Sequence, residues 1–369
     1  MSKIKALYVS PVPNFKGGAE HSLFDLLANP GVDPVLAVPA EGELADKARS
    51  LGIRVEVVDF GTVHEVQRPF KFSSGLKVMA DAWRAAGSLK EIVSSNAINI
   101  VHTNGLKAHS IAVLMRLRST AKIVMHFRDI AYTWQEKLVW QLLAFSGSRA
   151  VYVSAACCPD ERVPSNGRVI FNGVDPKPAI VRNPSTPLRV GFIGRIHPHK
   201  GLHVLLDWLH YAKGKGVCVH LLVRGKFSQE APGYESEIKA KIAAYGLGES
   251  VEFQGFVSDP EKVYDGLDVV CAPAQAAEPL GRTILEPLNM GLPVIATLTG
   301  GTKEMILPNV TGFAVHSAEE FYTAIQTIQS EPKTIDSMVN AGRDHVNANF
   351  SKRKLHQSIC ELYQELLPA

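Results

Sequence analysis

The 369-residue sequence lacks any apolar run long enough to cross a lipid bilayer. Residues 1–10 lead directly into a strand pattern, so no signal peptide is expected. Cysteine is also scarce, and the spacing of the cysteines does not match that of metal ligands. The five cysteines are Cys157, Cys158, Cys218, Cys271 and Cys360. These absences argue against an integral membrane protein and a disulfide-stabilised domain, and they favour a reduced, cytoplasmic protein.

A nucleic-acid-recognition motif is absent too, and the basic residues do not alternate with stacking aromatics, so no nucleic-acid partner is expected. The formal net charge is only +3, but it is unevenly distributed. Residues 66–122 contain nine lysines and arginines and two acidic residues, Asp81 and Glu91. Two interpretations remain open. This stretch is either a solvated basic face or a surface that meets an anionic membrane or a phosphorylated acceptor.

Short apolar segments alternate with longer helical segments in both halves of the chain. Several apolar segments are almost continuous, which is typical of parallel strands buried on both faces. Strands are expected near residues 4–10, 34–38, 53–58, 98–103, 121–127 and 149–153, and near 188–193, 217–223, 250–254, 268–272 and 293–297. The length and the alternation predict an α/β protein made of two Rossmann-like, doubly wound domains.

A proline-rich segment without periodicity, residues 172–187, separates the two halves and is the predicted linker. The N-terminal domain is then expected at residues 1–171 and the C-terminal domain at 188–345. Residues 346–369 form an amphipathic helical pattern that could pack back on the N-terminal domain. Ligands bind at the carboxyl ends of strands in such sheets, so two facing domains are expected to share one cleft.

Two carboxylates, Glu278 and Glu286, lie eight positions apart near the fourth expected strand of the second half. Glu278 is expected in a loop, because Gly281 and a proline follow it, whereas Glu286 belongs to a helical run. A glycine turn comes after the next strand and contains Gly300, Gly301 and Thr302. The carboxylates are suited to bind sugar and ribose hydroxyls, and the turn is suited to receive phosphate, so the pattern predicts a sugar-nucleotide site.

Two cations follow the first strand of the second half. Gly194 follows that strand, and Arg195 and Lys200 lie five positions apart in the turn that opens the next helix. Both cations could reach one diphosphate, Arg195 as a planar fork and Lys200 as a point charge. They could equally be solvated loop residues. The carboxylates that follow another strand of the same sheet favour the first interpretation.

At this point the chain resembles a known family, the retaining glycosyltransferases of family 4 (glycosyl transferases group 1), which have the GT-B fold. The resemblance rests on Gly194-Arg195…Lys200-Gly201, on Glu278…Glu286 and on Gly300-Gly301-Thr302…Glu304. The N-terminal Gly17-Gly18-Ala19-Glu20 is similar to the glycine-rich first loop of that family, and Asn172-Gly173-Val174-Asp175 to the turn before its linker. One departure is Pro287, where the family usually has alanine. It could kink or delay the helix that contains Glu286.

The resemblance implies a role for each residue of the donor site. Glu278 would contact hydroxyls of the donor sugar, and the backbone amides of Leu280 and Gly281 would flank the sugar and the phosphate. Glu286 would bind the ribose hydroxyls. Read without the resemblance, the two glutamates would be a helix cap and a surface carboxylate.

The resemblance also implies a class of enzyme that needs no metal, because Arg195 and Lys200 would neutralise the diphosphate in place of Mg²⁺. The sequence contains no Asp-x-Asp motif, which agrees with this expectation. We therefore expect no metal site and no cofactor. The substrate is expected to be a nucleotide sugar, a UDP- or GDP-sugar.

Polar residues also follow two apolar strands of the first half. His102 and Asn104 end one strand, and His126, Arg128 and Asp129 end the next. By the resemblance, His126 would be the histidine that reaches the donor sugar or the reaction centre. A histidine at a strand end is often purely structural, and that alternative stays open for both histidines. Arg128 and Asp129 could bind acceptor groups or form a local ion pair.

Two further segments of the first half are candidates for contacts with ligands or membranes. Gly17 and Gly18 would let the backbone approach a ligand closely, whereas Glu20 is expected only to cap the following helix. An amphipathic interfacial surface could be formed by Trp134, Lys137, Leu138, Trp140 and Gln141 together with Phe70 and Phe72. Core packing explains the tryptophans equally well.

These observations predict a retaining, metal-independent glycosyltransferase. It would move a sugar from a nucleotide-sugar donor to a hydroxyl of a glycan, a lipid-linked glycan or a small molecule, in polysaccharide or glycoconjugate biosynthesis. We expect it in the cytoplasm, with a position at the inner face of the membrane left open. The alternatives are a sugar-nucleotide epimerase with the GT-B fold and a non-catalytic subunit that binds a sugar nucleotide.

Overall fold

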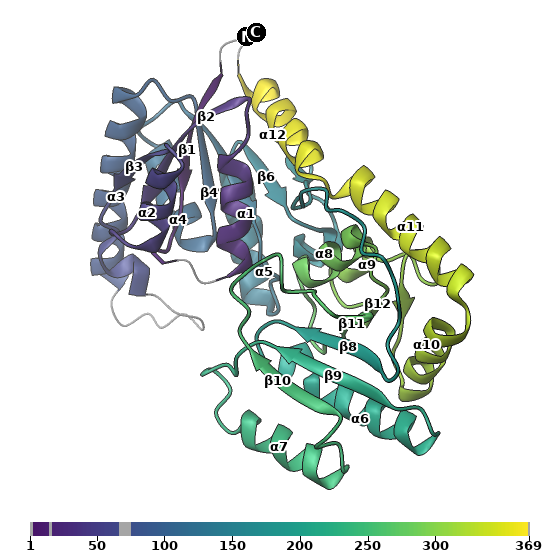
Figure 1. The fold of residues 1–369 in the computed structure, drawn as a ribbon. Helices are drawn as coiled ribbons and strands as arrows, with labels where there is room; N and C mark the ends of the chain where they lie inside the picture. The colour runs from purple at the N-terminus through teal and green to yellow at the C-terminus, as the bar shows by residue number, and fades with distance from the viewer. Residues whose placement is uncertain (1–2, 15–16, 66–74, 368–369) are drawn as a thin grey trace. The chain divides into compact units, whose positions relative to one another are not determined.

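The computed structural model describes residues 3–14, 17–65 and 75–367, and they form two compact units (Figure 1). The first unit consists of Met1–Gly173 together with Lys352–Ala369, and the second unit is Val174–Ser351. The expected linker, residues 172–187, has no helix or strand apart from an isolated bridge between Val174 and Ser351.

The first unit is built around a parallel sheet of seven strands in the order β3-β2-β1-β4-β5-β6-β7. The strands are β1 (Ile4–Val9), β2 (Val32–Val38), β3 (Arg54–Val57), β4 (Ile100–Asn104), β5 (Lys122–Phe127), β6 (Arg149–Tyr152) and β7 (Gly167–Val169). The α-helices are α1 (Gly18–Leu27), α2 (Glu43–Ser50), α3 (Gly75–Ser95), α4 (Leu106–Arg116), α5 (Trp134–Ser146) and α12 (Lys352–Leu366). The strand order reverses between β1 and β4, which makes this pair the topological switch point.

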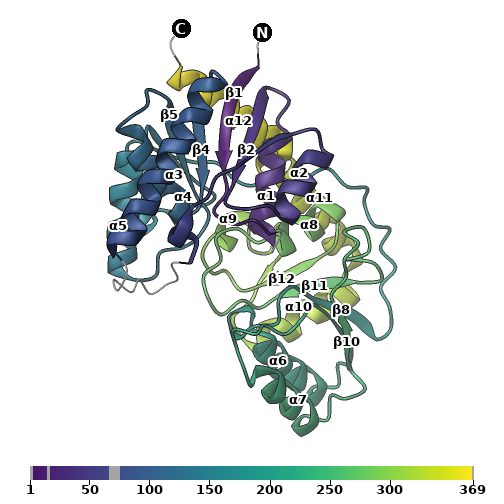
Figure 2. The same ribbon diagram turned by 90° about the vertical axis from the view of Figure 1, so that its left-hand side faces the viewer.

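Helices cover both faces of this sheet, as its nearly continuous apolar strands require (Figures 1 and 2). Helices α1, α2 and α12 share a buried cluster with the strands, in which Leu26, Leu44 and Ile359 are fully buried. On the opposite face α4 lies between α3 and α5. The last helix of the chain therefore completes the core that the first strands begin.

The second unit contains a parallel sheet of six strands in the order β10-β9-β8-β11-β12-β13, with its switch point between β8 and β11. The strands are β8 (Leu188–Ile193), β9 (Val219–Arg224), β10 (Val251–Gly255), β11 (Val269–Ala272), β12 (Val294–Ala296) and β13 (Phe313–Ala314). The α-helices are α6 (Leu202–Gly214), α7 (Tyr234–Ala244), α8 (Arg282–Met290), α9 (Thr302–Met305), α10 (Ala318–Ser330) and α11 (Pro332–Asn349).

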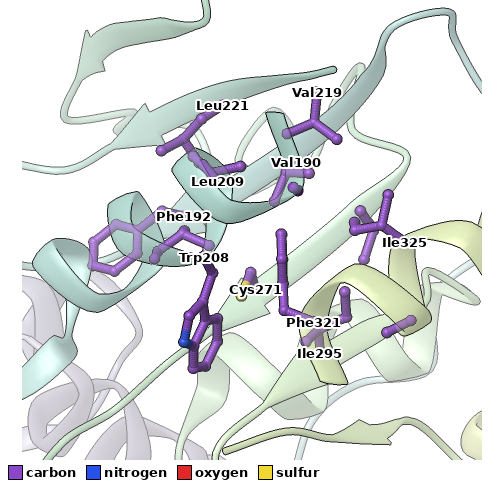
Figure 3. Close-up of a cluster of buried hydrophobic side chains, with 14 of the residues drawn as sticks. Val190, Phe192, Trp208, Leu209, Val219, Leu221, Cys271, Ile295, Phe321 and Ile325 are labelled. Atoms are coloured by element: carbon purple, nitrogen blue, oxygen red, sulfur yellow. The ribbon is translucent and has the colours of Figure 1, made fainter. Parts of the chain in front are cut away.

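The core of the second unit packs α6 and α10 against one face of its sheet. Figure 3 shows Trp208 of α6 beside Phe192 of β8, and Phe321 and Ile325 of α10 near Ile295 of β12. The rings of Trp208 and Phe321 stack with centroids 5.6 Å apart. This packing fixes the strands whose carboxyl ends carry the candidate site.

Three local features differ from the sequence analysis or refine it. Strands β7 and β13 were not predicted, because each is only two or three residues long at a sheet edge. Helix α8 begins at Arg282 and continues through Pro287, so the predicted delay of this helix does not occur. The helical pattern at the end of the chain comprises the last residues of α11 and, after a break at Phe350, α12.

Candidate functional site

In the second unit, the loops that follow β8 and β11 meet on the two sides of the switch point. The loop after β8 ends at Gly201, whose φ is +76°. A Cβ atom on Gly201 would lie 1.9 Å from the carbonyl oxygen of Pro273, directly after β11. The backbone N–H of Gln275 donates to the carbonyl of His199 at 2.7 Å. Only glycine lets the two loops approach this closely.

This approach brings Lys200 to Glu278. The Lys200 Nζ and Glu278 Oε1 atoms are 2.6 Å apart, and the side chains are 30% and 17% exposed. Because the pair is partly shielded from solvent, the attraction is stronger than that of an ordinary surface ion pair. The structure thus joins two of the predicted site residues, one from each loop.

The glycine turn after β12 holds the backbone of Glu278. Glu278 and Gly300 form a parallel bridge, and the Gly301 N–H donates to the Glu278 carbonyl at 2.7 Å. Gly300 has a φ of +58°, and a Cβ there would lie 2.5 Å from the Glu278 carbonyl oxygen. The buried Thr302 begins α9 directly after this turn. The predicted glycine turn is therefore what positions the first glutamate.

Arg195 lies in the same loop as Lys200 but has a different partner. Its Nη1 donates to Glu230 Oε2 at 2.8 Å, and both side chains are largely exposed. Gly194, with a φ of +124°, precedes it, and a Cβ on Gly225 would lie 1.8 Å from the Gly194 carbonyl oxygen. The two cations are therefore each held by a different carboxylate, and Glu230 was not predicted.

Glu286 is held within α8 and from the loop before β11. It accepts a hydrogen bond from Arg282 Nε at 2.8 Å and another from the Tyr264 hydroxyl at 2.9 Å. Burial and the nearby carboxylate raise the pKa of Tyr264 well above its ordinary value. Gly281 is the N-cap of α8 and Leu280 precedes it. The four-residue spacing of Arg282 and Glu286 was visible in the sequence, whereas nothing in the sequence pointed to Tyr264.

In the first unit, the two predicted histidines belong to one buried chain of hydrogen bonds. The Tyr363 hydroxyl donates to the Tyr8 hydroxyl at 3.1 Å and lies 2.6 Å from His102 Nδ1. His102 Nε2 lies 3.0 Å from His126 Nδ1. Burial lowers the pKa of both histidines well below the ordinary value, so both imidazoles are neutral at pH 7. We name this chain of four side chains the ring relay.

Asn104 and Arg128 lie beside the end of the ring relay. Asn104 is the register partner of His126 across β4 and β5. Arg128 Nε donates to Asn104 Oδ1 at 3.1 Å, and Arg128 Nη1 donates to the Ala19 carbonyl at 3.3 Å. Burial lowers the pKa of Arg128 to about 10, so it remains a cation at pH 7. Asp129 follows at the same strand end.

Three buried polar atoms in this cluster have no hydrogen-bond partner among the residues that the structure describes. They are His126 Nε2, Asn104 Nδ2 and Arg128 Nη2. Buried polar groups normally find partners, because leaving one unpaired is costly. Such a set, at the carboxyl ends of two strands, is suited to bind a polar ligand.

The glycine-rich first loop leads into α1. The Gly17 N–H donates to Glu20 Oε2 at 2.8 Å, so Glu20 caps the helix as predicted. Among the described residues, a Cβ on Gly17 or Gly18 would meet no atom within 4 Å. The described residues therefore leave space for a side chain at both positions.

The side chains of the predicted interfacial surface differ in their exposure. Four apolar side chains form an exposed stripe along α5: Trp134, Leu138, Leu142 and Phe145. Trp140 is 2% exposed and packs against Phe127, so core packing, the alternative left open for the tryptophans, holds for this residue. Phe70 and Phe72 lie outside the described residues, as do the basic Arg68 and Lys71 of the 66–122 stretch. Helix α3 exposes Leu76, Met79 and Trp83.

Two further properties of the described residues concern metals and membranes. Within residues 3–14, 17–65 and 75–367, no group of three His, Cys, Asp or Glu side chains is placed to hold a metal ion. In that same part of the chain, none of the helices combines the length and apolar character needed to span a bilayer.

Comparison with known proteins supports the resemblance that the sequence suggested. Residues 175–345 match the family model "Glycosyl transferases group 1". A curated relative, the putative colanic acid biosynthesis glycosyltransferase WcaL of Escherichia coli, is 25% identical over 220 residues. That alignment covers 57% of this chain and 52% of the relative, so the chain spans about half the length of this protein.

Two solved structures match almost the whole chain. Anabaena Alr3699/HepE, in complex with UDP, has a TM-score of 0.79 and 22% identity, with 99% of this chain and 100% of that chain covered. A glycosyltransferase from Rickettsia africae has a TM-score of 0.81 and 23% identity, with 99% of each chain covered. These likenesses show the fold. The predicted GT-B fold class, two Rossmann-like α/β units, is confirmed.

Proposed function

We propose that this chain, whose second unit matches the group 1 glycosyl transferases, is a retaining, metal-independent glycosyltransferase. It would move a sugar from a UDP- or GDP-sugar to a hydroxyl of a glycan, a lipid-linked glycan or a small molecule. The similarity to a colanic acid glycosyltransferase supports a role in polysaccharide or glycoconjugate biosynthesis. The UDP in a structurally similar protein makes a UDP-sugar the first donor to test.

The observation that carries this proposal is the pairing of Lys200 with Glu278 over the turn of Gly300. It places a cation and a hydroxyl-binding carboxylate side by side at the switch point of a doubly wound sheet, where such folds bind nucleotides. A donor that offers a diphosphate and sugar hydroxyls contains a partner for each group. Its phosphate would compete with Glu278 for the Lys200 ammonium.

In the proposed reaction the bond between the anomeric carbon and the donor diphosphate breaks as the acceptor hydroxyl attacks the same face. Negative charge gathers on the departing diphosphate, and Lys200 and Arg195 would stabilise it. The departing phosphate could take the proton of the acceptor hydroxyl, so the step needs no separate base. Glu278 would orient the sugar, and Glu286 the ribose. Lys200 and Arg195 would thus neutralise the diphosphate, which is the role that a divalent metal ion has in metal-dependent transferases.

The residues of the first unit would serve the sugar and the acceptor. His126, with the unpartnered Asn104 and Arg128 atoms beside it, offers both an acceptor and donors of hydrogen bonds. Asp129 at the same strand end and the open loop at Gly17 and Gly18 would complete the acceptor side. His102 would act through His126.

The exposed apolar stripe of α5 and the basic 66–122 stretch support a second element of the proposal, contact with the inner face of an anionic membrane. An apolar helix face can enter the headgroup region while nearby cations approach the lipid phosphates. A lipid-linked acceptor would be reached at such a surface. The chain would then work in the cytoplasm at the membrane.

The test is a donor screen on the purified full-length chain, which follows nucleotide release with and without acceptors. A transferase releases nucleotide mainly when an acceptor is present and yields a heavier acceptor, whose anomeric configuration shows retention. A stereoisomer of the donor or its sugar, formed without any acceptor, would support an epimerase instead. Binding without turnover of any donor would support a non-catalytic subunit.

A further inference from the structure

The ring relay in the first unit has a direction. The Tyr363 hydroxyl has a single hydrogen, and it donates that hydrogen to the Tyr8 hydroxyl. Tyr363 can therefore only accept from His102, whose Nδ1 lies 2.6 Å away. It follows that the ring hydrogen of His102 is on Nδ1.

A neutral imidazole has one N–H, so the position of the hydrogen on His102 also determines which ring donates in the hydrogen bond between His102 and His126. Burial keeps His102 neutral, and its Nε2 atom is then a bare acceptor. The hydrogen bond of 3.0 Å between His102 Nε2 and His126 Nδ1 must be donated by His126. The hydrogen of His126 is thereby placed on Nδ1, and its Nε2 lone pair is free.

We propose that Tyr8 and Tyr363 are positioning residues that fix His126 in its Nδ1–H form, so that Nε2 accepts a hydrogen bond from a hydroxyl of a bound sugar. The tautomer follows from the hydrogen bonds and from the neutral state of the buried His102, whereas the sugar rests on the proposed function. The free Nε2 atom is fully buried and has no partner within the described part of the chain. A hydroxyl group is the ligand chemistry that suits it, because a hydroxyl donates to Nε2 and can accept from a neighbouring donor.

Such donors lie beside His126. Asn104, its register partner, has an unpartnered Nδ2, and Arg128, bonded to Asn104, has an unpartnered Nη2. Both can only donate. If His126 presented an N–H as well, all three unpartnered atoms would be donors, and none of them could accept the hydrogen of a sugar hydroxyl. The direction of the ring relay therefore decides whether the unpartnered atoms include an acceptor for a hydroxyl.

The direct test is ¹⁵N NMR of the full-length protein with ¹⁵N-labelled histidine, with the His126 signals assigned from a His126→Gln variant. We expect an unprotonated, pyridine-like Nε2 and a protonated Nδ1 at pH 7. A protonated His126 Nε2 in the wild-type protein would overturn the proposal, whether or not the protein transfers sugar.

Tyr8→Phe gives a sharper test, because Tyr8 forms no hydrogen bond with His126. Without the Tyr8 oxygen, the Tyr363 hydrogen can satisfy itself only by turning to His102 Nδ1, which reverses every bond in the ring relay. The His126 hydrogen should then move from Nδ1 to Nε2. The matched control is Tyr152→Phe, which removes a buried hydroxyl from the same sheet without touching the ring relay. If His126 keeps its tautomer in Tyr8→Phe, the proposed coupling is wrong.

Activity gives a second readout. With a donor from the screen, Tyr8→Phe should lower kcat/KM about tenfold, the size of one lost hydrogen bond, while Tyr152→Phe changes it less than about twofold. The NMR test needs no donor, so a failure of the proposed tautomer can be distinguished from a failure of the proposed function. The predicted tautomer in a protein that transfers no sugar would overturn the proposed function only. Transfer that is unchanged in Tyr8→Phe with a reversed tautomer would overturn the role of the ring relay in binding.

Discussion

The Lys200 ammonium and the Glu278 carboxylate are 2.6 Å apart, so each compensates the charge of the other across two loops that follow different strands. A ligand that removes Lys200 from this pair must supply at least an equal negative charge. A diphosphate does so, whereas a neutral sugar does not. The pair therefore favours the intact donor, in which phosphate and sugar hydroxyls arrive together.

Removing either cation should slow the transfer reaction. Lys200→Ala and Arg195→Ala each delete a charge that is expected to stabilise the departing diphosphate, an effect typically worth about 2–4 kcal/mol of transition-state free energy. The readout is kcat/KM with the donor from the screen. Lys239→Ala removes a lysine that pairs with Glu235 on the surface of α7 and should leave kcat/KM unchanged. Near-normal turnover of both site variants would contradict the assignment of the donor site.

Transfer activity should survive chelation. If Arg195 and Lys200 neutralise the diphosphate, no divalent ion is needed for the departure of the nucleotide. The measurement compares initial rates after dialysis against EDTA with rates in added Mg²⁺ or Mn²⁺. A complete loss that either metal restores would show that the phosphate site has been misinterpreted.

The two glutamates should differ in what they bind. Glu286→Ala should weaken the binding of the bare nucleoside diphosphate, because its proposed partner is the ribose. Glu278→Ala should spare that binding and impair turnover of the nucleotide sugar. Calorimetry with UDP and UDP-glucose measures both, and Glu235→Ala is the surface control. Identical responses of the two variants to bare nucleotide would refute the division of roles.

The exposed stripe of α5 should bind anionic vesicles. Replacing Trp134 and Leu138 by alanine removes two side chains that are 70% and 47% exposed, so folding should be little affected while the apolar contact is lost. We expect weaker sedimentation with vesicles of phosphatidylglycerol and phosphatidylcholine, most clearly at low salt, where cations attract the surface over a longer range. Phe256→Ala, at an exposed phenylalanine of the second unit, is the control. Wild-type protein that ignores these vesicles at low salt would exclude the membrane contact.

The first unit should become less stable below pH 6.5. Burial lowers the pKa of His109 from 6.5 to about 3 and holds those of His102 and His126 well below the ordinary value. The unfolded chain therefore binds more protons between these pKa values, and the free energy of unfolding falls as the pH falls. For His109 alone, the loss between pH 6.5 and pH 5 is about 2 kcal/mol.

Urea unfolding at pH 7 and pH 5 measures this effect. His109→Gln should reduce the difference in unfolding free energy between the two pH values by that amount. The exposed His316 provides the control, because His316→Gln removes an imidazole without touching the buried cluster. An equal pH dependence in wild type and His109→Gln would contradict the assignment.

Much of the fold could be predicted because its strands are buried on both faces and read as continuous apolar segments. The short edge strands β7 and β13 carry too few apolar residues for such a pattern. The position of Trp140 stayed open because a tryptophan on a helix suits a core and an interface equally well, and only the packing against Phe127 decides between them. Pro287 does not shift the start of α8, which begins at Arg282 and includes the proline.

The candidate site was predictable where residues are close in sequence or follow strands. Glycines at positive φ, such as Gly201 and Gly300, are required where loops approach backbone, and both lie in motifs that the sequence already singled out. The partners of these motifs were not predictable. Tyr363 is 261 residues from His102, and no local pattern relates such distant positions. The roles assigned to the site residues remain predictions for the experiments above.

Helix α12 belongs to the first unit although 178 residues of the second unit precede it along the chain. During synthesis all residues of the second unit emerge from the ribosome in one continuous segment. The first unit is complete only after α12 has emerged, because α12 covers Leu26 and its neighbours and contains Tyr363. The nascent first unit thus exposes part of its apolar core for longer than the second unit does. A fragment ending at Gly173 lacks α12, so this apolar surface would stay exposed and the fragment should aggregate. The same surface of the nascent chain is where a chaperone would bind.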